Sequence, residues 1–276
     1  MRIDSHQHFW HLGRFDYSWM PAPPSPLARD YLPVDLQPIL ERNRFDGCIA
    51  VQATHDAREV DWLLALAGEH SFILGVVGWV DLTDPWIGAR LDTLQANPRF
   101  KGVRHLVQDE PDPAWLLRAD VLGGLSELAR RGIPYDLLIY PRHLHLIPQL
   151  ADRVPELRMV IDHIAKPPIG SGRLEGWAEG IARAAECPSV FVKLSGMITE
   201  ADHHDWKASD LKPYVAHVIG CFGVDRAMFG SDWPVCLLAG SWKAALAAFT
   251  QCIGAQPMEI RDKLLGGNAA RYYGLC

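Results

Sequence analysis

The 276-residue chain lacks several patterns that mark particular classes of protein. It has no cluster of basic residues, and its formal net charge of −6 argues against nucleic acid as a main partner. Its six cysteines are scattered and none forms a C-x-x-C pair, which favours reduced thiols over a zinc knuckle or disulfide framework. No apolar run approaches the roughly 18 residues of a membrane-spanning helix, and no signal peptide precedes the first predicted strand. We therefore expect a soluble, cytoplasmic protein that binds neither nucleic acid nor membrane.

What the sequence contains instead is a regular alternation of apolar stretches with amphipathic ones. The apolar stretches predict eight strands of a parallel sheet covered by helices. Eight such units favour a (β/α)8 barrel of the TIM type, a single domain over residues 1–276, because no G-x-G-x-x-G turn of an open sheet follows the first strand. The strands are predicted to begin at Ile3 and to cover 47–52, 72–80, 100–105, 133–139, 157–163, 190–194 and 226–230; the helices are predicted at 35–43 with Asp35 as N-cap, 57–69, from Asp84–Pro85 onward, 122–131, 142–153, 174–186, 211–221, 242–251 and 257–265.

The first predicted strand carries two histidines, His6 and His8. In an extended strand, residues i and i+2 point to the same face, about 7 Å apart. Two neutral imidazoles directed at one space suit a divalent cation or a shared water molecule. A chance pair of surface histidines is the alternative.

Other titratable residues collect where the predicted strands end, which is where the active sites of such barrels lie. Asp232 could hold a water molecule and take its proton, or bind a metal together with the two histidines; a turn or capping aspartate is the alternative. His163 could be a metal ligand, a general acid or a donor to a carbonyl group, or else a buried structural histidine. Asp162 precedes it and is expected to point away, toward the helices.

Several residues near the strand ends are candidates for substrate binding. Arg104 could bind a carboxylate or an oxyanion, but the adjacent His105 faces the opposite way, so at most one of them faces the site. The proline-rich segment 11–33 is predicted to cover the site, and His203 could reach over it or be merely solvated. Tryptophans could pack on the faces of sugar rings or fill the core and rim, the candidates being Trp10, Trp19, Trp79 and Trp233.

Four segments of the chain resemble the amidohydrolase superfamily. They are IDSHQHFW at 3–10, VIDHIAKP at 160–167, FGSDWP at 229–234 and GNAARYY at 267–273. The branch they resemble most contains the lactonases, including L-fuconolactone and L-rhamnonolactone hydrolases and the pyrone dicarboxylate lactonase. The similarity spans the whole chain and is specific for the family, but much less so for the substrate.

The resemblance implies a (β/α)8 barrel and hydrolysis at an ester or amide carbon. It implies that His6, His8 and His163 are the histidines of strands one and six, and that Asp232 is the acid that activates water. Dinuclear members use a bridging lysine or glutamate near the end of strand four or five, and none is found here. We therefore expect one divalent metal, such as zinc, or none, so that metal need not be required.

The leading hypothesis is hydrolysis of a sugar lactone, an L-fuconolactone-like aldonolactone, to the open-chain aldonic acid, with Asp232 as the base. The tryptophans and the absence of an arginine cluster favour a neutral polyhydroxy lactone over a dicarboxylate one. One alternative is a metal-dependent decarboxylase of the same superfamily, and another is a non-catalytic sugar-binding barrel. The expected partner is a small-molecule lactone, and a homo-oligomer is left open.

Overall fold

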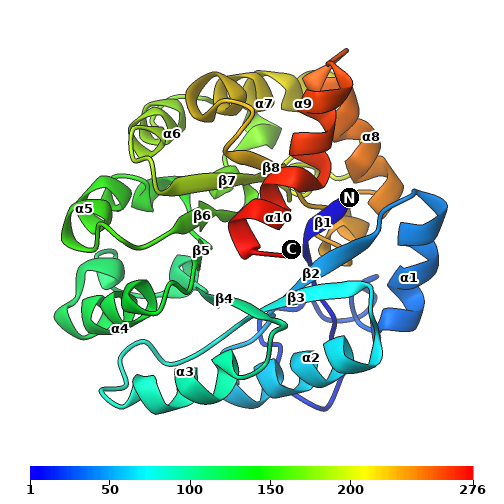
Figure 1. Ribbon diagram of the computed structural model, residues 1–276. Coiled ribbons are helices and arrows are strands. Elements are labelled where there is room, and N and C mark those ends of the chain that lie inside the picture. Colours follow the sequence, from blue (N-terminus) through cyan, green and yellow to red (C-terminus); the bar gives the residue numbers. More distant parts are fainter. Residues whose placement is uncertain (276) are drawn as a thin grey trace.

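The computed structural model describes residues 1–275 and confirms the predicted (β/α)8 barrel (Figure 1). Eight parallel strands are hydrogen-bonded to one another in chain order; one α-helix follows each of the first seven strands, and three follow the eighth. Near-continuous apolar sequence makes these strands, because both faces of the sheet are buried. The strands are β1 (Ile3–Gln7), β2 (Gly47–Val51), β3 (Ile73–Gly78), β4 (Phe100–His105), β5 (Tyr135–Leu137), β6 (Met159–Ile161), β7 (Val190–Leu194) and β8 (Ala227–Phe229).

The eight α-helices between Pro33 and Ile253 form the outer ring of the barrel (Figure 1), and each buries apolar side chains against it. In α4, for example, Val121, Leu125 and Leu128 recur at helical spacing and are fully buried. In the described part of the chain, no helix is long and apolar enough to cross a membrane. The helices are α1 (Pro33–Arg42), α2 (Ala57–Glu69), α3 (Ile87–Gln95), α4 (Ala119–Arg130), α5 (Leu146–Arg153), α6 (Trp177–Ala185), α7 (Ala208–Phe222), α8 (Trp242–Ile253), α9 (Met258–Asp262) and α10 (Asn268–Tyr273).

The two ends of the sheet meet just beyond β1 and β8. Gln7 and Trp233 form a parallel bridge, in which the His8 amide donates to the Trp233 carbonyl at 2.7 Å. The Asp232 amide donates to the His6 carbonyl at 2.9 Å. Backbone hydrogen bonds therefore fix Asp232 beside the histidine pair, although more than 200 residues separate them in sequence.

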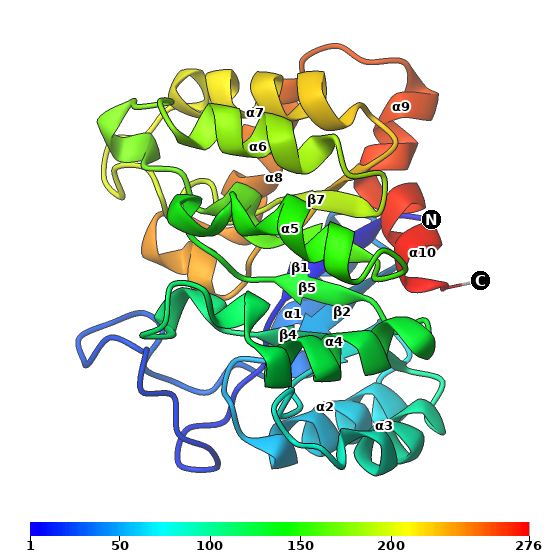
Figure 2. The same ribbon diagram turned by 90° about the vertical axis from the view of Figure 1, so that its left-hand side faces the viewer.

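The amino end of the barrel is plugged by α10. Its Tyr272 and Tyr273 pack with residues from inside the barrel, including Ile3 and Val160. The backbone approaches β1 so closely here that a Cβ at Gly266 would lie 2.4 Å from the Met1 carbonyl oxygen. Figure 2 shows α10 and both termini at one end of the barrel and the N-terminal loop, in blue, at the other.

Element boundaries differ from the prediction where side chains or backbone twist override periodicity. Asp35 lies in the first turn of α1 and not at its N-cap; its carboxylate accepts from the Leu32 amide at 2.9 Å. Helix α3 begins at Ile87. Before it, the Asp84 carboxylate accepts a hydrogen bond from the Trp86 amide at 2.8 Å and forms a turn. Strand β6 ends at Ile161, and a run of left-handed residues begins two residues later, at His163.

Candidate active site

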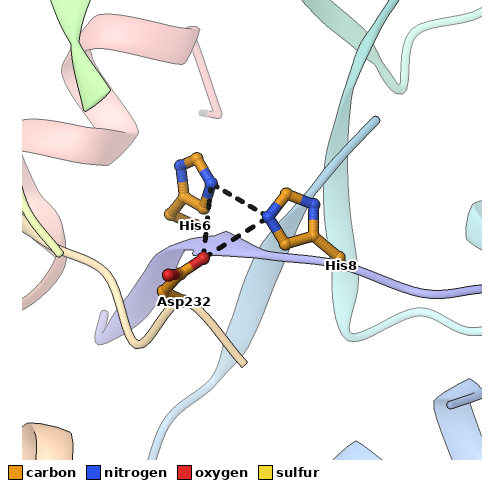
Figure 3. A group of neighbouring side chains, drawn as sticks. All are labelled: His6, His8 and Asp232. Carbon is orange, nitrogen blue, oxygen red and sulfur yellow. Dashed lines mark hydrogen bonds and ion pairs between the residues drawn. The ribbon is translucent and has the colours of Figure 1, made fainter. Parts of the chain in front are cut away.

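Three side chains from the two ends of the sheet converge at the carboxyl end of the barrel. Figure 3 shows the imidazoles of His6 and His8 and the carboxylate of Asp232 directed toward one another. The two Nε2 atoms lie 3.2 Å apart, and Asp232 Oδ1 lies 3.9 Å from His6 Nε2 and 3.5 Å from His8 Nε2. His163 Nε2 approaches the same oxygen at 3.9 Å. The structure thus brings together the four residues that the sequence pattern selected.

The barrel wall determines which nitrogen of His8 faces this cluster. Its Nδ1 donates to the Val51 carbonyl at 2.8 Å, and because a carbonyl only accepts, this nitrogen carries the proton of the neutral ring. The lone pair on Nε2 then points into the site. His8 is therefore oriented as a ligand or acceptor by a hydrogen bond to the neighbouring strand.

Asp232 is presented by a turn that a second carboxylate holds in place. Its φ of 57° lies in the left-handed region, which is uncommon for a residue other than glycine. Asp4, fully buried, accepts from the Ser231 amide at 2.8 Å, from Ser231 Oγ at 2.5 Å and from Trp242 Nε1 at 2.7 Å. Burial raises the pKa of Asp4 to about 6 in spite of these hydrogen bonds. Asp4 thus fixes the backbone immediately before Asp232.

His163 enters the site through an unusual backbone path. Its φ is 52°, and the left-handed conformation continues through Lys166 at 50°. His163 Nδ1 lies 2.9 Å from Ser195 Oγ. A Cβ at Gly196 would lie only 2.6 Å from that nitrogen, and Gly196 itself has a φ of 64°. Glycine at this position therefore leaves the space in which the imidazole lies.

The prediction that Asp162 points outward was wrong. Val160 packs inside the barrel, so Asp162, two residues further along, points inward as well. Asp162 Oδ1 lies 2.9 Å from Lys193 Nζ and 3.3 Å from His6 Nδ1, and Oδ2 accepts from Arg104 Nη1 at 3.2 Å. All four residues are buried. Asp162 is the centre of a buried ion network that contacts the Nδ1 atom of His6.

Of the two neighbouring candidates on β4, Arg104 faces the site. Besides Asp162, its Nη1 approaches His6 Nε2 at 3.3 Å. His105 points to the other side, where its Nδ1 accepts from Trp79 Nε1 at 2.9 Å and its ring stacks on Trp115 with centroids 4.0 Å apart. The open choice between Arg104 and His105 is thereby settled in favour of Arg104.

Burial sets the protonation states of the cluster. It lowers the pKa of His163 to about 4 and the pKa of His6 well below its ordinary value, and it also lowers the pKa of His8. Burial alone would raise the pKa of Asp232, but the neighbouring His163 and His8 rings and the charge of Lys166 outweigh it and lower this pKa. At neutral pH the site holds unprotonated imidazoles around an ionised carboxylate.

This set of donor atoms fits a divalent cation. Zinc binds imidazole nitrogen and carboxylate oxygen at about 2.0–2.2 Å, which places tetrahedral ligands roughly 3.3 Å apart. The separations of 3.2, 3.5 and 3.9 Å among His6, His8 and Asp232 lie near that spacing. Arg104 Nη1 approaches the same His6 nitrogen, so its guanidinium and a cation would compete for that lone pair.

A cavity of two adjoining lobes opens at the cluster. The first lobe has a volume of about 110 Å³ and the second about 200 Å³. Trp19, His163, Lys166, Asp232 and Val235 line both, so the cluster lies at their junction. The first lobe is further bounded by His8, Ala53, Arg104, Leu106, Gln108 and Leu138, and the second by Pro21, Thr199, Glu200 and Leu238.

The long segment 11–33 contributes directly to this cavity. Trp19 lines both lobes and Pro21 lines the second. Trp19 is held in place because its Nε1 donates to the Ala53 carbonyl at 2.7 Å. The segment therefore lies over the site, as its position in the sequence predicts, although only these two residues line the lobes.

The remaining candidates for substrate binding lie outside the lining. Trp10 and Trp233 are buried, and both pack edge-on against Tyr31, with ring centroids 5.4 and 5.2 Å away. His203 is exposed, and its Nε2 donates to the Thr199 carbonyl at 2.9 Å. Neither lobe is lined by any of these three residues.

The similarity of this chain to known proteins agrees with the arrangement of the site. The amidohydrolase family model matches residues 3–275. The chain belongs to the amidohydrolase family. It is 38% identical to an L-fucono-1,5-lactonase of Burkholderia ambifaria, covering 99% of this chain and 95% of the relative, and 37% identical to an L-fucono-1,5-lactonase of Burkholderia multivorans, covering 100% and 96%. A crystal structure of an amidohydrolase from Burkholderia multivorans with bound zinc superposes over the full length of both chains with a TM-score of 0.94 at 37% identity.

Some residues of this amidohydrolase site were not among the sequence-based candidates. Lys166 and Glu200 line the cavity, while Lys193 and Asp136 form a buried pair beneath it, with Nζ and Oδ2 2.5 Å apart. Lys166 lies within the VIDHIAKP segment, so its position in a segment that resembles the family could have marked it as a candidate. The left-handed backbone that turns it toward the cavity has no counterpart in a pattern of alternating residues.

Proposed function

We propose that this amidohydrolase hydrolyses a sugar lactone of the L-fucono-1,5-lactone type to the corresponding aldonic acid. The observation that carries the proposal is the ionised Asp232 carboxylate among unprotonated imidazoles at the junction of the two lobes. The two relatives named L-fucono-1,5-lactonase, which match nearly the full chain, support the same reaction class.

In the proposed reaction, Asp232 takes a proton from a water molecule as its oxygen attacks the lactone carbonyl. The bond between the carbonyl carbon and the ring oxygen then breaks, and the proton is passed from Asp232 to that oxygen to give a hydroxyl group. The new carboxylic acid ionises at neutral pH. Arg104, which lines the first lobe, provides the positive charge that stabilises a developing oxyanion.

A divalent metal fits the same proposal without being required by it. His6, His8 and Asp232, with His163 nearby, would hold the ion, which would polarise the lactone carbonyl or acidify water. The Val51 carbonyl and the Asp162 carboxylate would orient the two strand-one imidazoles in either case. The zinc-bound relative supports a metal in this family.

A neutral substrate agrees with the charges that line the cavity. Among the residues that line the two lobes, Arg104 is the sole arginine, and a dicarboxylate lactone would need more positive charge than Arg104 and Lys166 supply beside Asp232 and Glu200. Trp19 offers an aromatic face for a sugar ring. These features support a polyhydroxy lactone.

The test is a screen of aldonolactones in weakly buffered pH indicator, which detects the acid released on ring opening. We expect turnover of 1,5-lactones of six-carbon aldonic acids by the parent protein and a large loss in Asp232→Asn. Binding of lactones without acid release would support a sugar-binding barrel, and CO₂ release from unsaturated acids would support a decarboxylase. Either result in place of lactone turnover would contradict the proposal.

A further inference from the structure

The second lobe contains two opposite charges that the protein itself does not pair. Lys166 and Glu200 both line this lobe, and both side chains are half-buried. Among residues 1–275, neither the Lys166 ammonium nor the Glu200 carboxylate has a hydrogen bond or an ion pair. The Lys166 ammonium lies 5.6 Å from the centroid of the Tyr140 ring. Charged groups in a cavity that are left without partners are available to a ligand.

The backbone holds both residues in position. Lys166 ends the left-handed run that begins at His163, so it is fixed relative to that imidazole. Glu200 follows β7, and its carbonyl accepts from the Gly170 amide at 2.9 Å, which ties its loop to the loop after β6. Two connected loops therefore present one donor and one acceptor to the same space.

The pKa of Glu200 depends on its burial and on the charge of Lys166. Burial raises the pKa of Glu200, while the positive charge of Lys166 acts in the opposite direction. Because Glu200 and the ionised Asp232 both line this lobe, a substrate carboxylate there would gain from Lys166 and lose to the two carboxylates. A hydroxyl group, by contrast, can accept from an ammonium and donate to a carboxylate at the same time.

We propose that Lys166 and Glu200 form a hydroxyl-binding subsite in the second lobe, which selects neutral polyhydroxy lactones over carboxylated or unsubstituted ones. This inference rests on the proposed lactone hydrolysis. Neighbouring hydroxyls of the lactone ring accept from Lys166 and donate to Glu200, while the carbonyl lies at the junction beside Asp232 and His163. A substrate without these hydroxyls leaves two desolvated charges unpaired, which is the condition under which polar sites discriminate strongly.

The experiment compares Glu200→Gln and Lys166→Met with the parent on three substrates. These are a six-carbon 1,5-aldonolactone, δ-valerolactone, which has the same ring without hydroxyls, and a 1,5-lactone that bears a carboxylate. The matched control is Asp205→Asn on the same loop, whose carboxylate is 82% exposed. Both subsite variants should lose roughly tenfold or more in kcat/KM on the aldonolactone, mainly through KM, and change little on δ-valerolactone. Glu200→Gln should gain on the carboxylated lactone, because a repulsive charge is removed.

Equal losses on the aldonolactone and on δ-valerolactone would overturn the subsite, since they would place these residues in the reaction itself. So would parent-like kinetics in both variants. A readout independent of turnover separates this inference from the proposed function. The pyranose sugar, which has a hemiacetal in place of the lactone carbonyl, is titrated calorimetrically into the parent and the variants.

If the parent opens no lactone, the proposed function fails, and the sugar titration then decides the subsite alone. Binding to the parent and to Asp205→Asn that weakens roughly tenfold in Glu200→Gln and Lys166→Met supports the subsite. Absence of binding to the parent, or equal binding to all four proteins, overturns it.

Discussion

At the scale of single residues, the site depends on backbone conformations that few residue types adopt readily. His163 and Asp232 both have positive φ, and both project into the cavity because of it. Such conformations cost free energy and persist when surrounding contacts enforce them. Ser195 beside His163, and Asp4 beside Ser231, supply these contacts. The reactive side chains and the residues that hold them are therefore distinct, and substitutions can separate their roles.

Asp232→Asn tests the proposed base, because the side chain keeps its shape and loses its basicity. We expect kcat to fall by about 10²–10⁴-fold, the usual contribution of a positioned base, with little change in KM. Steady-state kinetics with a six-carbon aldonolactone measures both. Bound zinc should be quantified in parent and variant, because a lost metal would lower kcat by another route. Near-parental kcat in the variant would exclude Asp232 as the base.

Asp4→Asn tests the residue that fixes the turn. Both Asp4 oxygens accept hydrogen bonds, so the NH₂ group of asparagine must face a donor from Ser231 or Trp242. We expect a loss of about 1–3 kcal/mol in the free energy of unfolding, measured in urea. kcat should fall more than KM rises, since the turn carries Asp232. Asp205→Asn serves as the exposed control, and unchanged stability of Asp4→Asn would show that the turn does not depend on this carboxylate.

At the scale of elements, the strands were predictable because apolar runs of parallel strands are distinct from amphipathic helices. The pairing of His6 with His8 also followed from the period of two. Alternation failed for the residues that follow β6. It predicted that the Asp162 side chain points outward, whereas the structure places it inside the barrel. Periodicity applies only while the strand continues, and it carries no information about left-handed residues or about which of two faces is the barrel interior.

The segment 11–33 also combines two roles that its composition did not separate. Trp19 lines the cavity, whereas Leu27 and Tyr31 are buried in the core. Trimming the whole segment would therefore remove core side chains together with the cavity wall. Single substitutions are the sharper test of its function.

We expect Trp19→Ala to raise KM for the aldonolactone several-fold with little loss of stability, because its ring lines both lobes. Leu27→Ala, in the same segment, should instead lose about 2–5 kcal/mol in the free energy of unfolding while the folded fraction keeps its KM. Urea titrations and steady-state kinetics on both variants measure the contrast. If Trp19→Ala alters only stability, the segment encloses the barrel without contacting substrate.

At the scale of the whole molecule, the need for a metal depends on which residues surround the donor atoms of His6, His8 and Asp232. Neither strand four nor strand five offers a bridging lysine or glutamate, and Arg104 already approaches His6 Nε2. We therefore expect a chelator to lower lactonase activity partly or not at all, with metal content followed by mass spectrometry. Complete loss of activity that returns on adding zinc would instead establish an obligate single-metal site.

The pH dependence of stability follows from buried histidines throughout the barrel. Burial lowers the pKa of both His105 and His163 to about 4. The unfolded chain, with ordinary imidazoles, then binds more protons than the folded chain from about pH 6.5 downward, so stability falls as the pH falls toward 4. The raised pKa of Asp4, about 6, acts in the opposite direction, because its protonation in the folded state adds stability as the pH falls.

Burial also lowers the pKa of two further histidines to about 4, His55 and His143, and raises the pKa of two further carboxyl groups, Asp136 to about 6 and Glu59 to about 8. Because the histidines are the more numerous, we expect the urea midpoint to drop between pH 6.5 and 4. His105→Gln should flatten this slope, because the glutamine side chain can still accept from Trp79 but does not titrate. His203→Gln, on an exposed loop, is the matched control for replacing an imidazole by an amide. A slope that is the same in His105→Gln and the parent would show that burial does not keep this imidazole neutral in the folded state.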